Sequence, residues 1–469
     1  MQKIIFRNRE EELRFLNNIY RKEGKGLVVI YGRRRVGKTE LIKEFIKDKK
    51  AIYYLADKRG TRTNTNEFVK YCAEFFNDMP PDVDNFDGAF RYIMKRCGKE
   101  KLVVAIDEFP YLIEKDDSIP SIFQKIIDEI INKGNILLIL SGSSMSMMYE
   151  GVLSYKSPLY GRCVGKWELT PLRFKDILKF LDNMKIEDIV RYYAVFGNMP
   201  AYLVVINKHL SFEENVIENI LKKGGRLYRE PEIILREELS EPETYLSILE
   251  SMTHSTKLSE IASLSDLKAK DMPKYFRVLM NLGIIRREIS VTEKKTKKSR
   301  YYINDNLFTF WFRYCKPYLS LLEIGEEDYV FKKHIANELN NFIGKQFEGL
   351  CLDIIEEKYR KKFNKFGRFW CHHKEKGERR QIEIDIVALN EKTKEIAFFE
   401  VKWKNLRERE TMSILEELRE KSRFVEWNKD ERREYYGIIA KSIREKEMFR
   451  DKGYICYDLR DFEKLVRKR

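Results

Sequence analysis

A glycine-rich loop is the segment whose residue types and spacing have the clearest chemical meaning. It reads GRRRVGKT, follows the apolar run Leu27–Tyr31 and precedes the helical stretch TELIKEF. A strand, this loop and a helix in that order bind phosphate, because backbone N–H groups and a helix N-terminus surround the anion. Lys38 then reaches the β- and γ-phosphate oxygens, and the Thr39 hydroxyl holds Mg²⁺. The residues expected to bind ATP or ADP here are Gly32, Arg33, Arg34, Arg35, Val36, Gly37, Lys38, Thr39 and Glu40.

The run LVVAIDE supplies the acidic half of such a site. A buried strand delivers Asp107 to its carboxyl end, where ligands of open α/β sheets bind. We expect Asp107 to organise the hydrated Mg²⁺ and Glu108 to act as general base towards the attacking water. A further strand, ILLILSGSS, ends at the same edge. Ser141 or Ser143 therefore either senses the γ-phosphate or serves as a helix cap or polar turn.

A second group of reactive side chains lies near the C-terminus. In QIEIDIVAL, strand alternation places Glu383 and Asp385 on one face, and in AFFEVKW it places Glu400 beside Lys402. If these strands pair as a hairpin, Asp385 and Glu400 can bridge Mg²⁺ while Lys402 orients or deprotonates a water. The same pattern also suits the solvated face of a hairpin that carries no chemistry.

Cysteine and histidine give no comparable signal. Cys371, His372 and His373 are consecutive on a predicted strand, so they cannot all face one ion, and we expect them in the core and on the surface. The seven cysteines form no CxxC pair, which argues against a zinc ribbon or a disulfide framework and favours reduced thiols.

The elements around the loop predict an α/β fold with a mostly parallel sheet. Apolar runs alternate with amphipathic helical stretches, as in sheets covered on both faces. The predicted strands are Leu27–Tyr31, Ala51–Leu55, Leu102–Ile106, Ile136–Ser141 and Lys166–Leu169. The following segment reads as helical, and a further α/β domain with five strands ends the chain. We expect an ATPase core at 1–172, a helical lid at 173–239, a winged helix at 240–325 and the last domain at 326–469.

The predicted winged helix rests on three helical segments followed by two short strands. Asp271 suits the N-cap of the third helix and Pro273 its first turn. Basic residues lie on or near that helix and in the loop between the strands, where they would meet DNA phosphates: Lys268, Lys270, Lys274, Arg277, Lys294, Lys295, Lys297, Lys298 and Arg300. The alternative is a rigid spacer or a protein contact.

Length and composition bound these expectations. The 469 residues exceed what one core usually serves, and 43% hydrophobic residues suffice for folding. The net charge of +15 makes nucleic acid the leading partner. There is no apolar run long enough for a membrane span and no secretory leader, so we expect a cytoplasmic protein without a membrane partner.

The first half of the chain resembles a known family. The segments FRNREEEL, YGRRRVGKTEL, AIDEF, LSGSS, SPLYGR, TPLRF and FGNMPAYL are similar to the archaeal ATPase family of the STAND and AAA+-related P-loop ATPases, whose phosphate site includes a second acidic residue. The resemblance implies that Phe6 to Arg9 help to cradle the adenine, that Arg162 is an arginine finger and that Pro200 lies near the nucleotide as a sensor. A finger acting in trans implies a homo-oligomer, of which a ring is one form. An ordinary salt-bridged arginine is the alternative for Arg162.

The last 130 residues resemble a second family. Asp385, Glu400 and Lys402 at D-x14-E-x-K spacing, preceded by helical Glu348, are similar to the restriction-endonuclease-like PD-(D/E)XK nucleases. The resemblance implies metal ligation by the three carboxylates. Ile384 stands where that family usually has proline, so the resemblance leaves cleavage open, and a nuclease fold that only binds DNA is the alternative.

Together these patterns predict an ATP-hydrolysing P-loop ATPase that handles DNA and couples nucleotide state to a winged helix and a Mg²⁺-dependent nuclease-like domain. The alternative from another class is a slow STAND-type nucleotide switch whose last domain binds but does not cut DNA. A transcription regulator that binds one specific sequence is a third hypothesis.

Overall fold

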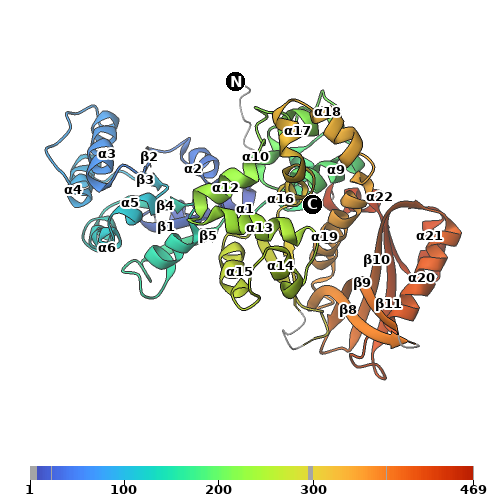
Figure 1. The fold of residues 1–469 in the computed structure, drawn as a ribbon. Helices are drawn as coiled ribbons and strands as arrows, with labels where there is room; N and C mark the ends of the chain where they lie inside the picture. The colour runs from blue at the N-terminus through green and yellow to red at the C-terminus, as the bar shows by residue number, and fades with distance from the viewer. Residues whose placement is uncertain (1–7, 23, 294–298, 376–377, 468–469) are drawn as a thin grey trace. The chain divides into compact units, whose positions relative to one another are not determined.

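The computed structural model describes residues 8–22, 24–293, 299–375 and 378–467 (Figure 1). The chain divides into two compact units. Unit 1 comprises residues 1–171 and 199–204, and unit 2 comprises residues 172–198 and 205–469. The four predicted domains and the boundaries between them stay predictions. In the described part of the chain, no helix combines the length and apolar character that crossing a membrane would need.

Unit 1 is built on a five-stranded parallel sheet of order β2-β3-β4-β1-β5, which confirms the predicted α/β architecture. Its strands are β1 (Gly26–Tyr31), β2 (Ala51–Leu55), β3 (Leu102–Asp107), β4 (Ile136–Gly142) and β5 (Cys163–Glu168). Its helices are α1 (Glu10–Lys22), α2 (Lys38–Ile46), α3 (Thr61–Phe75), α4 (Phe86–Cys97), α5 (Pro110–Lys115), α6 (Ile119–Glu129), α7 (Met145–Met148) and α10 (Pro200–Leu203).

Burial explains which strands could be predicted accurately from the sequence. The central strands β3 and β4 are buried at every position, so their apolar runs are continuous. Strand β5 lies at the sheet edge and alternates half-buried with exposed residues. It begins at Cys163, three residues before the predicted start. The prediction missed these residues because CVGKWE lacks a continuous apolar run. This displacement matters for Arg162, which comes directly before the strand.

Unit 2 begins with helices and a small hairpin. These are α8 (Phe174–Phe180), α9 (Ile186–Phe196), α11 (Phe212–Val216), α12 (Glu230–Glu238), α13 (Pro242–Met252), α14 (Leu258–Leu264), α15 (Met272–Asn281), β6 (Ile285–Glu288), β7 (Arg300–Ile303), α16 (Asn306–Tyr314), α17 (Leu319–Glu323) and α18 (Glu327–Val330). We call residues 242–303 the hairpin unit. Its three helices precede the antiparallel β6–β7 pair, the order expected of a winged helix. Pro273 lies in the first turn of α15, but the Asp271 side chain does not cap it.

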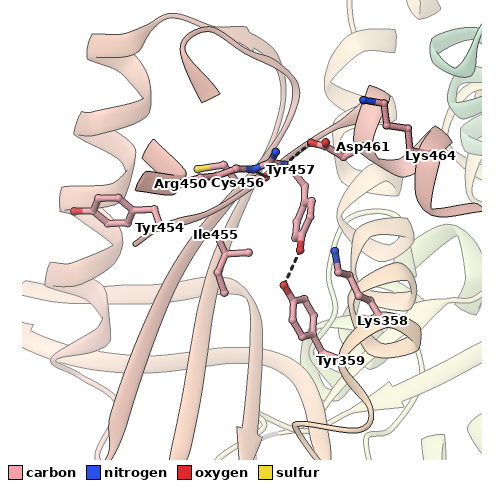
Figure 2. Close-up of a pocket in the computed structure, with 9 residues that line it drawn as sticks. All are labelled: Lys358, Tyr359, Arg450, Tyr454, Ile455, Cys456, Tyr457, Asp461 and Lys464. Atoms are coloured by element: carbon pink, nitrogen blue, oxygen red, sulfur yellow. Dashed lines mark hydrogen bonds and ion pairs between the residues drawn. The ribbon is translucent and has the colours of Figure 1, made fainter. Parts of the chain in front are cut away.

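The C-terminal part of unit 2 carries a second five-stranded sheet, of order β12-β11-β10-β9-β8. Its elements are α19 (Leu339–Tyr359), β8 (Lys365–Glu375), β9 (Glu378–Asn390), β10 (Glu395–Leu406), α20 (Glu408–Ser422), β11 (Arg433–Ile443), α21 (Lys446–Asp451), β12 (Ile455–Asp458) and α22 (Leu459–Arg467). Strands β8, β9 and β10 are antiparallel, whereas β10, β11 and β12 are parallel. Helix α19 covers one face and α20 the other (Figure 1). At the β12 edge, α19 and α22 border a cavity of about 470 Å³ (Figure 2).

Candidate functional site

The glycine-rich loop joins β1 to α2 in the geometry that phosphate binding requires. Gly37, at the N-cap of α2, has φ +94° and no side chain that could cap the helix. The first N–H groups of a helix have no intrahelical acceptor and therefore suit an anion. Gly32 has φ +154°, and a Cβ there would lie 2.3 Å from the carbonyl oxygen of Leu169. Only glycine suits these two positions, which fixes the loop's shape from the sequence.

Lys38 and Thr39 take the places expected of them at the start of α2. The Lys38 ammonium is buried and donates to the carbonyl oxygens of Gly32 (3.0 Å) and Arg33 (3.1 Å), which draws it across the loop. The Thr39 hydroxyl donates to Asp107 Oδ2 at 2.6 Å. The loop threonine and the acidic end of β3 are therefore in contact, which is the arrangement for sharing one Mg²⁺.

Asp107 is the centre of a hydrogen-bond network at the carboxyl edge of the sheet. Besides Thr39, it accepts from the hydroxyls of Tyr53 (2.8 Å) and Ser141, and from the N–H of Glu108 (3.0 Å). Strand β4 lies between β1 and β3, which brings Ser141 next to Asp107. These donors keep a fully buried carboxylate satisfied. Its hard oxygen donors suit Mg²⁺.

Glu108 is held in position by its backbone and by one serine. Its φ of +53° lies in the left-handed region, a conformation that costs a non-glycine residue about 1 kcal/mol and is typical of functional sites. Its carboxylate accepts from the N–H (3.1 Å) and the hydroxyl (2.7 Å) of Ser143. Ser141 thus contacts Asp107 and Ser143 contacts Glu108, and their expected role, sensing the γ-phosphate or forming a cap or polar turn, stays a prediction.

Sequence reasoning missed Tyr53. It lies on β2, and its hydroxyl donates to Asp107. Burial, and then the charge of Asp107, raise the pKa of the Tyr53 phenol, so it stays a donor. The run AIYYL predicts a strand, but nothing in it indicates that the strand would end beside β3.

Two of the expected nucleotide contacts border the loop. The Arg9 guanidinium donates to the carbonyl oxygens of Val36 (3.0 Å) and Thr170 (2.8 Å). Pro200, at the start of α10, approaches Gly37 from its open side, with Cγ 3.8 Å from where a Cβ would stand. Phe6 lies outside the described residues. Among the loop arginines, Arg34 donates to the Tyr111 hydroxyl at 2.9 Å.

Arg162 lies at the end of the sheet opposite the glycine-rich loop of the same chain. Cys163 pairs with Leu27, at the amino end of β1, whereas the loop follows Tyr31 at the carboxyl end. The guanidinium instead makes an ion pair with Asp128 at 2.8 Å. A role as finger therefore remains a hypothesis for a second subunit only, as in the trans arrangement.

In unit 2, two carboxylates lie where neighbouring strands separate. Strands β9 and β10 pair from Glu395 opposite Asn390 to Phe399 opposite Ile386. Beyond that point β9 continues with β8 and β10 with β11. The next residues in this register are Asp385 and Glu400, at the fork. This confirms the hairpin on which their convergence depended.

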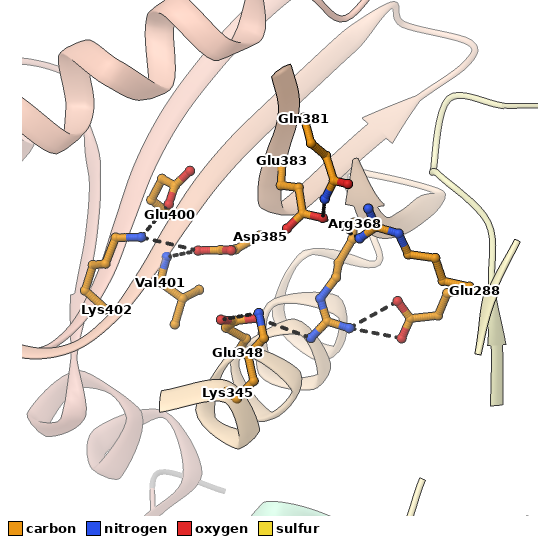
Figure 3. Close-up of polar contacts among 11 residues, drawn as sticks. Glu288, Lys345, Glu348, Arg368, Gln381, Glu383, Asp385, Glu400, Val401 and Lys402 are labelled. Carbon is orange, nitrogen blue, oxygen red and sulfur yellow. Dashed lines mark hydrogen bonds and ion pairs between the residues drawn. The ribbon is translucent and has the colours of Figure 1, made fainter. Parts of the chain in front are cut away.

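Like charges shape the acidity of Asp385. Its carboxylate accepts from the N–H of Val401 at 2.9 Å and lies 3.8 Å from the Lys402 ammonium (Figure 3). Burial, then the charges of Glu400 and Glu348, raise the pKa of Asp385 to about 7. A cation beside Asp385 would relieve this repulsion.

Glu400 has the opposite environment. It accepts from Lys402 at 2.7 Å and from Lys421 of α20 at 2.8 Å. Burial alone would raise the pKa of Glu400, but these two lysines outweigh it and hold the pKa below its usual value. Lys421 was missed by sequence reasoning, because a lysine in the last turn of a charged helix carries no signal of its own.

An arginine whose side chain is only 12% exposed joins the fork to the hairpin unit. Arg368 of β8 contacts Glu288 of β6 at 3.0 Å and Glu348 of α19 at 3.6 Å (Figure 3). The N–H of Val291 also donates to the carbonyl oxygen of Arg368 at 2.9 Å. Glu348 is thus bound to a cation of β8.

The three expected metal ligands are not gathered around one point. Within residues 8–467, as far as they are described, no three histidine, cysteine or carboxylate side chains form a metal-holding group. Glu400 is turned to its lysines and Glu348 to Arg368. The donor chemistry suits Mg²⁺, but these side chains do not converge on one point, and metal ligation by the three carboxylates stays a prediction. His372 and His373 are exposed and Cys371 half-buried, as expected.

The basic residues of the hairpin unit divide into two groups. Lys268, Lys270, Lys274 and Arg277 are exposed on or before α15. Arg300, predicted to meet phosphates, is instead buried on β7, where it pairs with Glu383 of β9 and covers the Trp370 ring. Lys294, Lys295, Lys297 and Lys298 lie outside the described residues.

Comparison with known proteins finds two families along the chain. Residues 6–206 match a family described as an ATPase domain predominantly from Archaea, and residues 311–414 match one described as archaea bacterial proteins of unknown function. An uncharacterized protein of Methanocaldococcus jannaschii is 35% identical over 465 residues, which cover 98% of this chain and 100% of that protein. An uncharacterized ATP-binding protein of the same organism is 51% identical over 47 residues, 10% of this chain and 80% of that protein.

Solved structures with similarity to the chain include a Walker-type ATPase of Pyrococcus abyssi, at 19% identity and a TM-score of 0.49, covering 66% of this chain and 96% of that one. A STAND protein with a tetratricopeptide repeat sensor from Pyrococcus horikoshii has 17% identity and a TM-score of 0.31, covering 77% of this chain and 52% of that one.

Proposed function

Because the chain belongs to the archaeal family of P-loop ATPases, we propose that it hydrolyses ATP at the Lys38, Thr39 and Asp107 site, with Glu108 as general base. The observation that carries the proposal is the 2.6 Å contact between Thr39 and Asp107. This contact joins the loop after β1 to the acidic end of β3, although β4 separates these two strands in the sheet.

Each residue has a defined task in the reaction. The α2 N–H groups and Lys38 bind the β- and γ-phosphates. Mg²⁺, when bound by Thr39 and Asp107, neutralises charge on the phosphate oxygens. Glu108, oriented by Ser143, takes a proton from water as its oxygen attacks the γ-phosphorus, and the bond to the ADP oxygen breaks to give ADP and inorganic phosphate.

The Glu108→Gln variant tests the general base. Gln keeps the two Ser143 contacts in outline but cannot accept the proton, so ATP should bind with unchanged affinity while turnover falls about 10²-fold or more. Equilibrium binding of labelled ATP and steady-state phosphate release measure the two effects separately. Unchanged turnover would remove Glu108 from this role, and lost binding would point to damage at Asp107 instead.

For unit 2 we propose Mg²⁺-dependent DNA cleavage at the fork. What supports it is the pairing of a carboxyl whose pKa is raised to about 7 with a lysine 3.8 Å away at a break between strands. Lys402 would orient a water or stabilise charge that develops on the phosphate. The exposed basic side chains near α15 would supply contacts to the DNA backbone.

The second proposal is a nucleotide-operated switch whose C-terminal domain binds DNA without cutting it. The contact of Glu400 with both Lys402 and Lys421 favours it, since two ammonium groups occupy a carboxylate that a metal would need. DNA incubated with Mg²⁺ and the full chain distinguishes the two. Scission that disappears in Asp385→Asn and Lys402→Ala supports cleavage, whereas intact DNA with ATP-dependent binding supports the switch.

A further inference from the structure

A pocket at the β12 edge of the C-terminal sheet lies outside both sites described above. It separates the end of α19 from β12 and α22 (Figure 2). In sheet order, β12 is two strands away from β10, which carries Glu400. The pocket's charged lining residues are Lys358, Arg450, Asp461 and Lys464.

The carboxylate of the pocket is already neutralised. Asp461 accepts from Lys446 at 2.7 Å and from Arg450 at 3.0 Å. Arg450 also donates to the carbonyl oxygen of Cys456 at 2.7 Å, so its guanidinium is engaged with the wall. Among the described residues, neither Lys358 nor Lys464 has a carboxylate within ion-pair distance. Two ammonium groups therefore give the pocket a net positive charge.

Aromatic side chains hold one of these cations in place. The Lys358 ammonium lies 4.1 Å from the centre of the Tyr457 ring and 5.5 Å from that of Tyr359. Burial among these groups lowers the pKa of Lys358, although Asp461 opposes the shift. The hydroxyls of Tyr359 and Tyr457 are 2.6 Å apart, and since one O–H serves that bond, the other is available to a ligand (Figure 2).

We propose that this pocket binds a phosphate group, with Lys358 and Lys464 as its charge partners and the Tyr359–Tyr457 pair as a neutral donor. Compact ammonium groups bind phosphate as point charges, and a ring face keeps a lysine ordered without using its N–H donors. The phosphate belongs either to a nucleic acid strand or to a free nucleotide. The site does not depend on ATP hydrolysis in unit 1 or on cleavage at Asp385.

The experiment uses the full chain carrying Lys38→Ala, so that the glycine-rich loop contributes little phosphate binding, in buffer without divalent metal. Fluorescence anisotropy follows a labelled short single-stranded DNA, and calorimetry follows AMP and inorganic phosphate. Lys358→Gln and Lys464→Gln are compared with Lys452→Gln, a matched exposed lysine between α21 and β12 that does not line the pocket. Thermal unfolding midpoints check that each variant is folded.

We expect each pocket variant to weaken binding about tenfold, and the control to leave it unchanged. For DNA, each variant should also lower the slope of log affinity against log salt by roughly 0.7, one phosphate contact. An effect confined to the DNA arm identifies a nucleic acid strand as the source of the phosphate, and an effect on AMP and inorganic phosphate identifies a free nucleotide or phosphate ion. Equal binding by the background chain and both pocket variants in every arm would overturn the proposal, as would an equal loss in Lys452→Gln.

Discussion

The two acidic sites of this chain satisfy their carboxylates in opposite ways. In unit 1, Asp107 accepts from three hydroxyls and one N–H, all neutral donors. In unit 2, Asp385 has one N–H donor and lies among the charges of Glu400, Glu348 and Lys402. Neutral dipoles hold a carboxylate ready for a cation without competing for it, whereas lysines and arginines compete.

The comparison distinguishes a preorganised metal site, at Asp107, from one at the fork that must rearrange before a metal can bind. The hydroxyl and N–H donors to Asp107 are all neutral, so no charged group has to leave it before Mg²⁺ can bind. At the fork, a metal must displace Lys402 or Lys421 from Glu400, or draw Glu348 from Arg368. We therefore expect unit 1 to bind its metal–nucleotide complex readily, and unit 2 to bind a divalent ion weakly unless DNA engages the cations.

The largest expected effect tests whether the acidic sites of the two units act independently. Lys38→Ala should lower the kcat/KM of ATP hydrolysis about 10³-fold, because it removes the cation that binds the β- and γ-phosphates. Asp385→Asn should leave hydrolysis within about twofold of wild type when DNA is absent. Phosphate release at several ATP concentrations measures both. Retained turnover in Lys38→Ala would refute the assignment of the nucleotide site.

Removing Arg368 tests the competition in unit 2. Arg368→Met should lower the free energy of unfolding of unit 2 by about 3 kcal/mol, since it removes the largely buried cation shared by Glu288 and Glu348. Among the described residues, these two carboxylates then keep only Arg286 and Lys345 as ion-pair partners. Urea unfolding of the full chain measures the change. Lys345→Gln is the matched control: Lys345 also contacts Glu348, at 3.4 Å, but is exposed, and its loss should cost less than about 0.5 kcal/mol. Equal losses would show that burial of Arg368 is unimportant.

The acidity of Asp385 predicts a dependence of stability on pH. The folded protein retains this proton up to about pH 7, whereas the unfolded chain releases it near 3.8. The folded state therefore binds more protons in this interval, and its contribution to stability falls as the pH rises. Asp385→Asn should flatten that fall and raise the unfolding midpoint at pH 7. A variant less stable than wild type at pH 7 would contradict the raised pKa.

The smallest expected effect on ATP hydrolysis comes from Tyr53, and it tests how far each hydrogen bond to Asp107 contributes. Tyr53→Phe removes one of its four donors while keeping the ring, at a cost of about 1 kcal/mol. Hydrolysis should fall about fivefold, with a higher Mg²⁺ requirement. Titration of activity with Mg²⁺ measures it, and Tyr54→Phe, which loses a contact to Asn64 rather than Asp107, is the control. Identical behaviour of the two variants would exclude a role for the Asp107 contact.

The sequence predicted what local patterns determine. Gly32, Gly37, Lys38 and Thr39 lie in one loop whose shape depends on its own residues, so spacing was enough. Tyr53, Lys421 and Arg368 reach their sites through strand order and helix packing, which spacing does not encode.

Three expectations show the limit of a motif. Asp385, Glu400 and Lys402 converge as the hairpin required, but the metal-ligand geometry depended on Lys421 and Arg368, which no pattern identified. Arg162 was placed near phosphate by resemblance alone, and an unrecognised start of β5 puts it at the far end of the sheet. Arg300 is similar: it belongs to a basic run, yet its side chain is buried against Trp370 and pairs with the partly exposed Glu383.

The bond from Val291 to Arg368 has a consequence for distance. A main-chain hydrogen bond, reinforced by Glu288 and Arg300, fastens the hairpin unit to β8 and β9. If the chain binds a duplex along α15, the distance between the bound DNA segment and the fork would consequently be constant. Any cut would then fall a set number of base pairs from the bound position, whatever sequence lies there.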